Sequence, residues 1–301
     1  MNEARETPGF TLRDLLHGYV YARWPYLYIG IGTGEHWLAR ILGPIVRLMR
    51  KILPRARVTS DQPVYADTYH GKVVTTSAAR RLVTVNEEVR LPELEQVVPY
   101  KLARDLILKN PGHIVALECP CRAARSEPCT PLDVCLIVGE PFASFVTEHH
   151  PRRSRWILPE QAIEILEQEH SRGHVHHAFF KEAMFGRFYA ICNCCPCCCG
   201  AMSAYRNGTP MLTSSGYVSR VDIDWCIGCE ICAEACPFSA IEIGEGCARV
   251  DEDRCMGCGV CVSVCDQRAI SLELDSSKGV PLEIDKLIAE VEEAGEGASY
   301  F

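Results

Sequence analysis

Cysteine dominates the chemistry that this chain can perform. There are nineteen cysteines among its 301 residues, and every one of them lies at position 119 or later. A count this high indicates disulfide bonds or bound metal. Residues 1–6 lack the charged and then apolar layout of a signal peptide, so we expect a cytoplasmic protein whose thiols stay reduced and bind metal.

Two runs near the C-terminus space four cysteines in the same way, C-x2-C-x2-C-x3-C. Bacterial ferredoxins hold two [4Fe–4S] clusters with this spacing, because three cysteines of a run bind one cluster and the fourth binds the other. We therefore expect crossed ligand sets. The first set is Cys226, Cys229, Cys232 and Cys265, and the second is Cys255, Cys258, Cys261 and Cys236.

The residues around the two runs fit this interpretation. Gly228, Gly257 and Gly259 allow backbone N–H groups to approach a cluster closely. Residues 240–243 and 269–274 alternate apolar and polar side chains, as short half-buried strands do, and they follow their runs at the same interval. The stretch is thus an internal duplication. Zinc held by paired CxxC motifs is the alternative, but zinc ribbons need no third cysteine at this spacing.

Residues 216–275 therefore resemble the two-[4Fe–4S] ferredoxin domain family, and the resemblance implies electron transfer. The chain departs from this family at one place, because Cys265 is followed by Asp266 where proline is usual. A charge there should change the reduction potential of the cluster that Cys265 binds. Cys247 lies between the runs and outside the pattern, where we expect a small buried side chain.

Ten further cysteines precede the ferredoxin-like stretch. They are Cys119, Cys121, Cys129, Cys135, Cys192, Cys194, Cys195, Cys197, Cys198 and Cys199. Adjacent cysteines cannot all pair as disulfides, because the geometry is too strained, so thiolate ligation of a soft metal is the remaining option. Ten thiols suffice for one or two further iron–sulfur clusters, with copper or zinc binding as the alternative. Cys192, Cys195 and Cys198 repeat C-x2-C-x2-C and can hold three corners of a cluster.

Polar residues near these cysteines can join the same centre. Arg122, directly after Cys121, can stabilise the negative charge of a cluster or can be a solvated surface residue. His174, His176 and His177 can be metal or haem ligands, although a strand edge at the surface is the simpler interpretation. The sequence leaves both questions open.

Regular elements must hold the cysteine loops in place. The stretches that read as buried strands are residues 114–117, 134–138 and 185–191. Residues 159–170 predict a helix with proline in its first turn, and residues 98–108 predict another. We therefore expect an α+β chain, with an α/β-type domain over residues 59–215 that carries metal-binding loops, followed by the ferredoxin-like module.

The two ends of the chain differ in charge. Residues 1–58 form a basic arm, in which an amphipathic helix over residues 37–53 can lie on a membrane surface, dock into a partner or pack on its own domain. Residues 220–301 carry eighteen Asp and Glu against six Lys and Arg, and residues 276–301 predict an acidic helix or tail. This acidity argues against nucleic-acid binding and favours docking to a basic patch on a redox partner.

The arrangement CxCR, two spaced cysteines before a strand, and CNCCxCCC resembles a group of poorly characterised ferredoxin-fusion proteins of anaerobes. The resemblance implies a cysteine-rich 4Fe–4S electron-transfer domain and no particular substrate. The leading hypothesis is thus an electron-transfer subunit or adaptor that serves a partner redox enzyme. A reductase whose second centre acts on a substrate, with catalytic residues unknown, and a metal-binding or redox-sensing protein are the alternatives.

The crossed ligand sets can be tested with one substitution. Replacing Cys236→Ser should damage the cluster of Cys255, Cys258 and Cys261 and leave the other closer to intact, as measured by iron content and EPR of the reduced protein. If only the cluster of the first run were lost, the assignment of the fourth ligands would be wrong.

Overall fold

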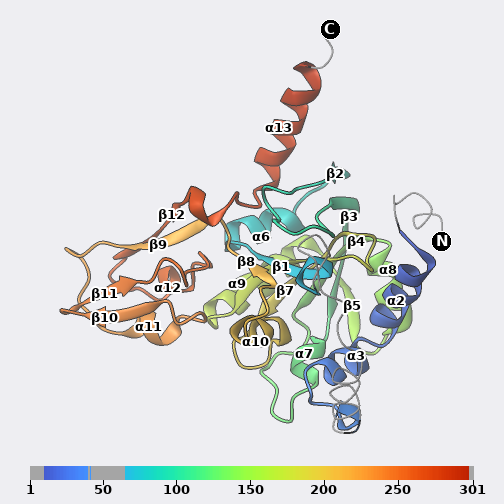
Figure 1. Ribbon diagram of the computed structural model, residues 1–301, viewed down its shortest axis with the longest axis horizontal. Helices are drawn as coiled ribbons and strands as arrows, with labels where there is room; N and C mark the ends of the chain where they lie inside the picture. The colour runs from blue at the N-terminus through green and yellow to red at the C-terminus, as the bar shows by residue number, and fades with distance from the viewer. Residues whose placement is uncertain (1–9, 40, 42–64, 298–301) are drawn as a thin grey trace, which may run out of the picture.

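The computed structural model describes residues 10–39, 41 and 65–297 (Figure 1). In this part of the chain helices and strands are mixed around one large curled sheet, with a small module attached at its side. The α+β class expected from the sequence is confirmed. None of the helices within the described ranges is long and apolar enough to cross a membrane.

One sheet of eight strands organises the main body. Its strands are β1 (Tyr69–Val73), β2 (Val89–Leu91), β3 (Leu106–Leu117), β4 (Cys135–Glu140), β5 (Ser154–Ile157), β6 (Val175–Lys181), β7 (Arg187–Cys194) and β8 (Leu212–Thr213). The order is β2-β3-β4-β7-β6-β1-β8, with β5 paired to β3. Every pair is antiparallel except β1–β8. The strands predicted before Cys119, at Cys135 and before Cys192 are confirmed.

Alternation along the strands gives the sheet two different faces. In β4, Leu136 and Val138 join the core on one face, whereas Cys135 and Ile137 join the core on the other. The first face packs against α6 (Thr76–Val83) and α9 (Pro159–Ser171). The helix predicted at residues 159–170 is therefore confirmed as α9. The second face packs against α2 (Leu12–Arg23), α8 (Phe142–His149) and α10 (Gly200–Arg206), and it collects sulfur and aromatic side chains.

The helix predicted over residues 98–108 is wrong. The segment is irregular until β3 begins at Leu106, and Ala103 has a left-handed backbone with φ 57°. Val98 precedes a proline, which disfavours helical backbone. Leu106 and Leu108 instead pair with β2 and bury both side chains in the core, so tertiary packing decides the local structure.

Two helices of the N-terminal arm pack on the main body. They are α2 (Leu12–Arg23) and α3 (Pro25–Gly32). Thr11 and Asp14 form a capping box at the start of α2, and Tyr21 is buried against the second face of the sheet. This half of the arm therefore packs on its own domain. The amphipathic helix expected over residues 37–53 falls mostly outside the described residues.

The ferredoxin-like module lies beside the sheet, at the left of Figure 1. Its elements are β9 (Tyr217–Val221), α11 (Ile231–Ala235), β10 (Ile241–Gly244), β11 (Cys247–Val250), α12 (Val260–Ser263) and β12 (Ile270–Leu274). β10 pairs with β11 and β12 pairs with β9, both antiparallel. The two short strands predicted after the cysteine runs are confirmed as β10 and β12.

The chain then returns to the main body. After η1 (Ser276–Lys278), Leu282 and Ile284 are buried in the core of the first face, and α13 (Ile284–Gly297) begins. Arg81 pairs with Asp285 at 2.7 Å across this contact. The module is thus anchored to the body at both of its ends.

The packing of α2 on the main body can be tested at Gly18. A Cβ there would lie 2.0 Å from the carbonyl oxygen of Ala183, whereas a Cβ at Gly32 in α3 would meet nothing within 4 Å. Gly18→Ala should therefore destabilise the protein by roughly 1–3 kcal/mol. Gly32→Ala is the matched control and should change stability by less than about 1 kcal/mol. Equal melting temperatures for the two variants would contradict the packing of α2 on Ala183.

Candidate metal centres

The structure brings together the two predicted sets of ferredoxin cysteines. Burial raises the pKa of Cys232, and the charges of Cys226, Cys229 and Cys265 raise it further. Burial likewise raises the pKa of Cys258, with further contributions from its three expected partners, Cys261, Cys236 and Cys255. A small cavity is lined by all four cysteines of the first set. The fourth thiol of each run thus lies with the other run, although ligation itself stays a prediction.

Glycine and backbone donors shape these two sites. Gly228 and Gly257 have φ of 64° and 62°, and a Cβ on either would lie within 2.4 Å of a backbone oxygen. The backbone N–H of Ala248 donates to the Cys226 sulfur at 3.4 Å, and that of Ala240 donates to the Cys236 sulfur at 3.3 Å. Donors of this kind stabilise the charged thiolates that a cluster requires. The donor set and the tight loops therefore fit [4Fe–4S] clusters.

The two ferredoxin sets have different surroundings. Beside the first set, Cys229 is exposed and the side chains of Trp225 and Ile227 are each 65% exposed. In the second run, Met256 and Val260 are buried in the core on the second face of the sheet. The second set therefore faces the main body, and the first set lies at the outer end of the module.

The ten other cysteines separate into two groups. Six of them form what we call the six-thiol ring, namely Cys119, Cys121, Cys135, Cys192, Cys194 and Cys199. The other four form the thiol quartet, namely Cys129, Cys195, Cys197 and Cys198, whose sulfur atoms all lie within 4.8 Å of one another. Cys192 is not a member of the quartet, whereas Cys195 and Cys198 are. The shared cluster suggested by the C-x2-C-x2-C spacing of these three cysteines stays a prediction.

The ring thiols are close enough to shift one another's pKa. Cys119 and Cys192 raise the pKa of Cys135, Cys121 raises that of Cys119, and Cys119 and Cys199 shift that of Cys121 in opposite directions. Cys199 donates to the sulfur of Cys194 at 3.1 Å, and Cys194 lies two residues from Cys192 on the same face of β7. The start of α7 (Pro120–Ala123) with its N-cap Cys119, the strands β4 and β7, and the residue before α10 therefore direct six thiols toward one place.

The ring lines an apolar cavity of about 80 Å³. Its walls include Tyr21, Tyr69, Tyr189 and Phe179, and the hydroxyls of Tyr21 and Tyr189 are 2.8 Å apart. The ammonium of Lys181, which is 1% exposed, lies 4.5 Å from the ring centres of Tyr21 and Tyr69. Aromatic walls keep water from the thiols, and the faces of Tyr21 and Tyr69 stabilise the Lys181 ammonium, whose pKa burial lowers to about 8.

The raised pKa values of the ring thiols indicate what kind of ligand the ring fits. The interaction with Cys121, together with burial, raises the pKa of Cys119 to about 12. Cys199 lowers the pKa of Cys194, but burial and neighbouring thiolates raise it to about 12 overall. Without a cation, these thiols stay protonated at neutral pH. A bound soft metal removes the protons and satisfies the sulfur atoms, so the residues fit a thiolate-ligated metal centre.

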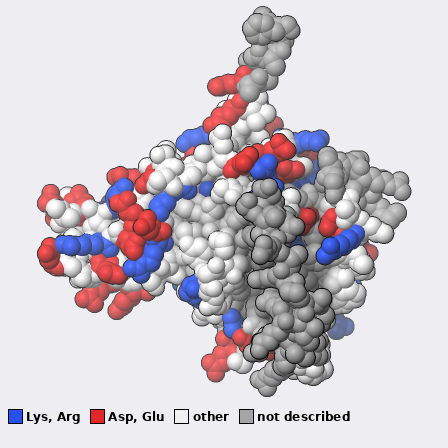
Figure 2. Space-filling model, viewed as in Figure 1, with Lys and Arg blue, Asp and Glu red and all other residues white. Residues whose placement is uncertain are grey.

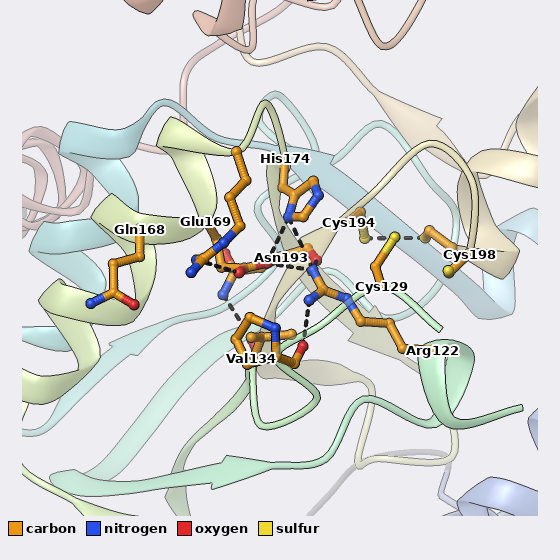
Figure 3. A network of polar contacts seen from close by, with 12 residues as sticks. Arg122, Cys129, Val134, Gln168, Glu169, His174, Asn193, Cys194 and Cys198 are labelled. Atoms are coloured by element: carbon orange, nitrogen blue, oxygen red, sulfur yellow. Dashed lines mark hydrogen bonds and ion pairs between the residues drawn. The ribbon is translucent and has the colours of Figure 1, made fainter. Parts of the chain in front are cut away.

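Arg122 sits between the ring and the quartet in a buried polar network (Figure 3). Its side chain is 1% exposed and forms an ion pair with Glu169, which is fully buried. The guanidinium also donates to the carbonyl oxygens of Pro131 at 2.6 Å and Asn193 at 3.1 Å. Burial opposes the charge, but Glu169 and the nearby thiolates of both groups raise the pKa of Arg122. Arg122 is therefore a fixed internal cation, not a solvated surface residue.

The three histidines are buried in or beside β6, an interior strand, so the surface-edge interpretation is wrong. His174 lies in the Arg122 network, where its Nδ1 is 2.7 Å from a Glu169 oxygen. His176 donates from Nδ1 to the side-chain oxygen of Asn193 at 2.6 Å. His177 lies opposite Cys192 in the β6–β7 register, and burial lowers its pKa to about 3. Its neutral ring therefore lies beside one thiol of the six-thiol ring.

Sequence reasoning missed several members of this site. Glu169 and Lys181 carry no motif, and their burial comes from the packing of α9 and β6. Tyr21 belongs to an aromatic stretch that the sequence shows plainly, but nothing in that stretch indicates that α2 covers the cysteines. These residues come from distant segments, so no local spacing could connect them with the thiols.

The Arg122–Glu169 pair predicts a stability effect. Arg122→Met leaves the Glu169 carboxylate buried without its main counter-charge and should cost about 3–5 kcal/mol in unfolding free energy. The double variant Arg122→Met/Glu169→Met should recover much of this loss. Arg172→Met is the control. Arg172 also pairs with Glu169, but its side chain is 39% exposed to solvent, so its loss should cost much less.

The pair also predicts a pH dependence. Burial opposes the charge of Glu169, but hydrogen bonds from His174 and Arg122 hold its pKa below the usual value. Its contribution should be complete at neutral pH and disappear as the pH falls through that lowered pKa. Anaerobic denaturant titrations across this range measure both effects. If Arg122→Met were as stable as the double variant Arg122→Met/Glu169→Met, the predicted cost of the unpaired Glu169 carboxylate would be wrong.

Comparison with known proteins supports the ferredoxin part of the chain. Residues 225–269 match the family model described as a 4Fe–4S dicluster domain. No curated protein matches the chain. The C-terminal module is thus similar to dicluster ferredoxin domains, and the described part of the chain also contains a compact cluster of four cysteines that could hold a metal ion.

Proposed function

We propose that this chain is an iron–sulfur electron-transfer protein that relays electrons between the ferredoxin module, the six-thiol ring and a partner redox enzyme. One observation carries the proposal. Met256 and Val260, next to cysteines of the second ferredoxin set, share a hydrophobic core with Cys194 and Cys199 of the ring. The module that binds 4Fe–4S clusters is therefore packed directly on the body that gathers the other thiols.

Side chains of the two parts are in direct contact. The hydroxyl of Tyr205 in α10 lies 3.6 Å from the sulfur of Met256, and α10 begins directly after Cys199. Gly173, after α9, lies near Val260 of α12. Packed side chains thus join the second ferredoxin run to the body that carries the ring. Such a contact suits electron exchange inside one protein.

The outer end of the module suits a partner protein. Trp225, Ile227 and Ile231 are exposed beside the first cysteine set, and Figure 2 shows acidic side chains over the module and over α13. An apolar contact surrounded by acids matches a partner with a basic surface, because complementary charge speeds encounter. In the proposed relay, electrons enter or leave the protein at this end and pass inward through the second set.

A cluster at the ring supplies one-electron redox chemistry, and the chain's own residues set its conditions. Cys119, Cys121, Cys135, Cys192, Cys194 and Cys199 would hold it. The tyrosines around the cavity exclude water, and Arg122 offsets the charge of the thiolates. The cavity is bounded by the thiols themselves, so bound metal would occupy it. This favours a relay over the alternative of a reductase with a substrate at the ring.

The test compares iron in the full-length protein with iron in ring variants, all purified anaerobically. The wild type should contain more iron and sulfide than two [4Fe–4S] clusters hold. The double variant Cys119→Ser/Cys192→Ser should lose the excess and keep the EPR signals of the reduced ferredoxin module. Cys247→Ser, outside every predicted set, is the control and should keep all the iron.

The proposal also predicts an order of reduction. In rapid-freeze EPR with a low-potential donor, the ferredoxin signals should appear before any change at the ring. A wild type whose iron is accounted for by two clusters would contradict iron at the ring. It would leave the chain a ferredoxin with a separate thiol-metal site.

A further inference from the structure

The thiol quartet differs from the two ferredoxin sets in the spacing of its sulfur atoms. Cys129 and Cys197 have sulfurs 2.9 Å apart, and those of Cys197 and Cys198 are 3.7 Å apart. The four sulfurs of the quartet, including that of Cys195, all lie within 4.8 Å of one another. Across residues 10–39, 41 and 65–297, no other group of three or more potential metal ligands is this compact.

Metal geometry gives this spacing a meaning. Four sulfurs at about 2.3 Å from one tetrahedral ion lie about 3.8 Å from one another. Four thiolates at the corners of a [4Fe–4S] cube lie farther apart, roughly 6 Å, because the iron atoms separate them. The eight ferredoxin cysteines provide an internal comparison. They belong to a 4Fe–4S dicluster domain and form no group within 4.8 Å, whereas the quartet does.

We propose that Cys129, Cys195, Cys197 and Cys198 bind a single metal ion, zinc or iron, in a mononuclear tetrathiolate site. This site is separate from the iron–sulfur clusters and does not depend on the relay proposed above. Four thiolates leave no open position on a tetrahedral ion, as in structural zinc sites. The ion would therefore hold the chain together and would not act on a substrate.

The position of the quartet shows what the ion would hold. Cys129 lies in the segment between α7 (Pro120–Ala123) and β4, and its other three members lie in the turn between β7 and α10. A ring cysteine borders each segment. Cys121 precedes the first segment, and Cys199 ends the second. One ion bound across them would fix the two segments that shape one side of the ring.

Nearby hydrogen bonds and ion pairs also connect these two segments. Arg125 donates to the carbonyl oxygen of Cys198 at 3.3 Å, and it also pairs with Glu35 of the N-terminal arm. Arg122 donates to the carbonyl oxygen of Pro131, two residues after Cys129. Figure 3 shows Cys129 and Cys198 beside the Arg122 network. Two arginines thus hold the same segments that the quartet would link.

X-ray absorption on the intact, anaerobically purified protein tests the coordination without any substitution. At the zinc edge we expect one shell of four sulfurs at about 2.3 Å and no metal neighbour. If the site holds iron instead, the oxidised protein should show the high-spin ferric EPR signal of a mononuclear site. Either result supports the proposal and identifies the ion.

Substitution tests which cysteines are involved. Cys129→Ser and Cys197→Ser should each lose about one metal ion per chain and keep the ferredoxin EPR signals. Cys247→Ser is the matched control and should lose none. Two outcomes would overturn the proposal. One is the loss of a whole cluster's iron and sulfide in Cys129→Ser, and the other is a Cys129–Cys197 disulfide found by mass spectrometry of the anaerobic protein.

Discussion

The crowding of thiols in a dry interior constrains everything else in this molecule. Thiolates placed side by side repel one another, and burial makes each charge costly. The raised pKa values of Cys119 and Cys194 express that conflict. Bound metal would resolve it, because an ion would replace the protons and bind several sulfurs at once. In the proposed protein, metal binding would therefore contribute to the folding free energy of the body as well as to its chemistry.

The antiparallel sheet is what makes the crowding possible. Alternate residues of β4 and β7 face the same side, so Cys135, Cys192 and Cys194 point together without any cysteine motif linking the strands. The opposite side of the same strands buries aliphatic side chains and Phe188, without cysteine, and packs against α6 and α9. One sheet thus separates an ordinary hydrophobic core from a sulfur-rich one, and the Arg122–Glu169 pair lies where loop and helix meet beside the sulfur-rich side.

The features predicted best from the sequence are those that depend on residues close together in the chain. The ferredoxin runs, their strands and the helix at residues 159–170 depend on neighbours within a few residues, and the structure contains all of them. The division of ten cysteines into ring and quartet depends on which loops meet in space. Local spacing does not show this division, since Cys192, Cys195 and Cys198 repeat a cluster motif but only the last two belong to the quartet. The irregular segment before Leu106 failed as a helix for the same reason, because β2 pairing outweighed local propensity.

The anchoring of the ferredoxin module gives the molecule a direction. Leu282 and Ile284 return the chain to the main core, and Met256 and Val260 bury the inner cysteine run, so the module cannot swing freely. Its outer end keeps Trp225 and Ile227 exposed amid acidic charge. A free ferredoxin can exchange electrons from any orientation, but here one end faces solvent and the other faces a buried thiol site. Such polarity is the arrangement that a relay requires, and it follows from packing and not from the motif itself.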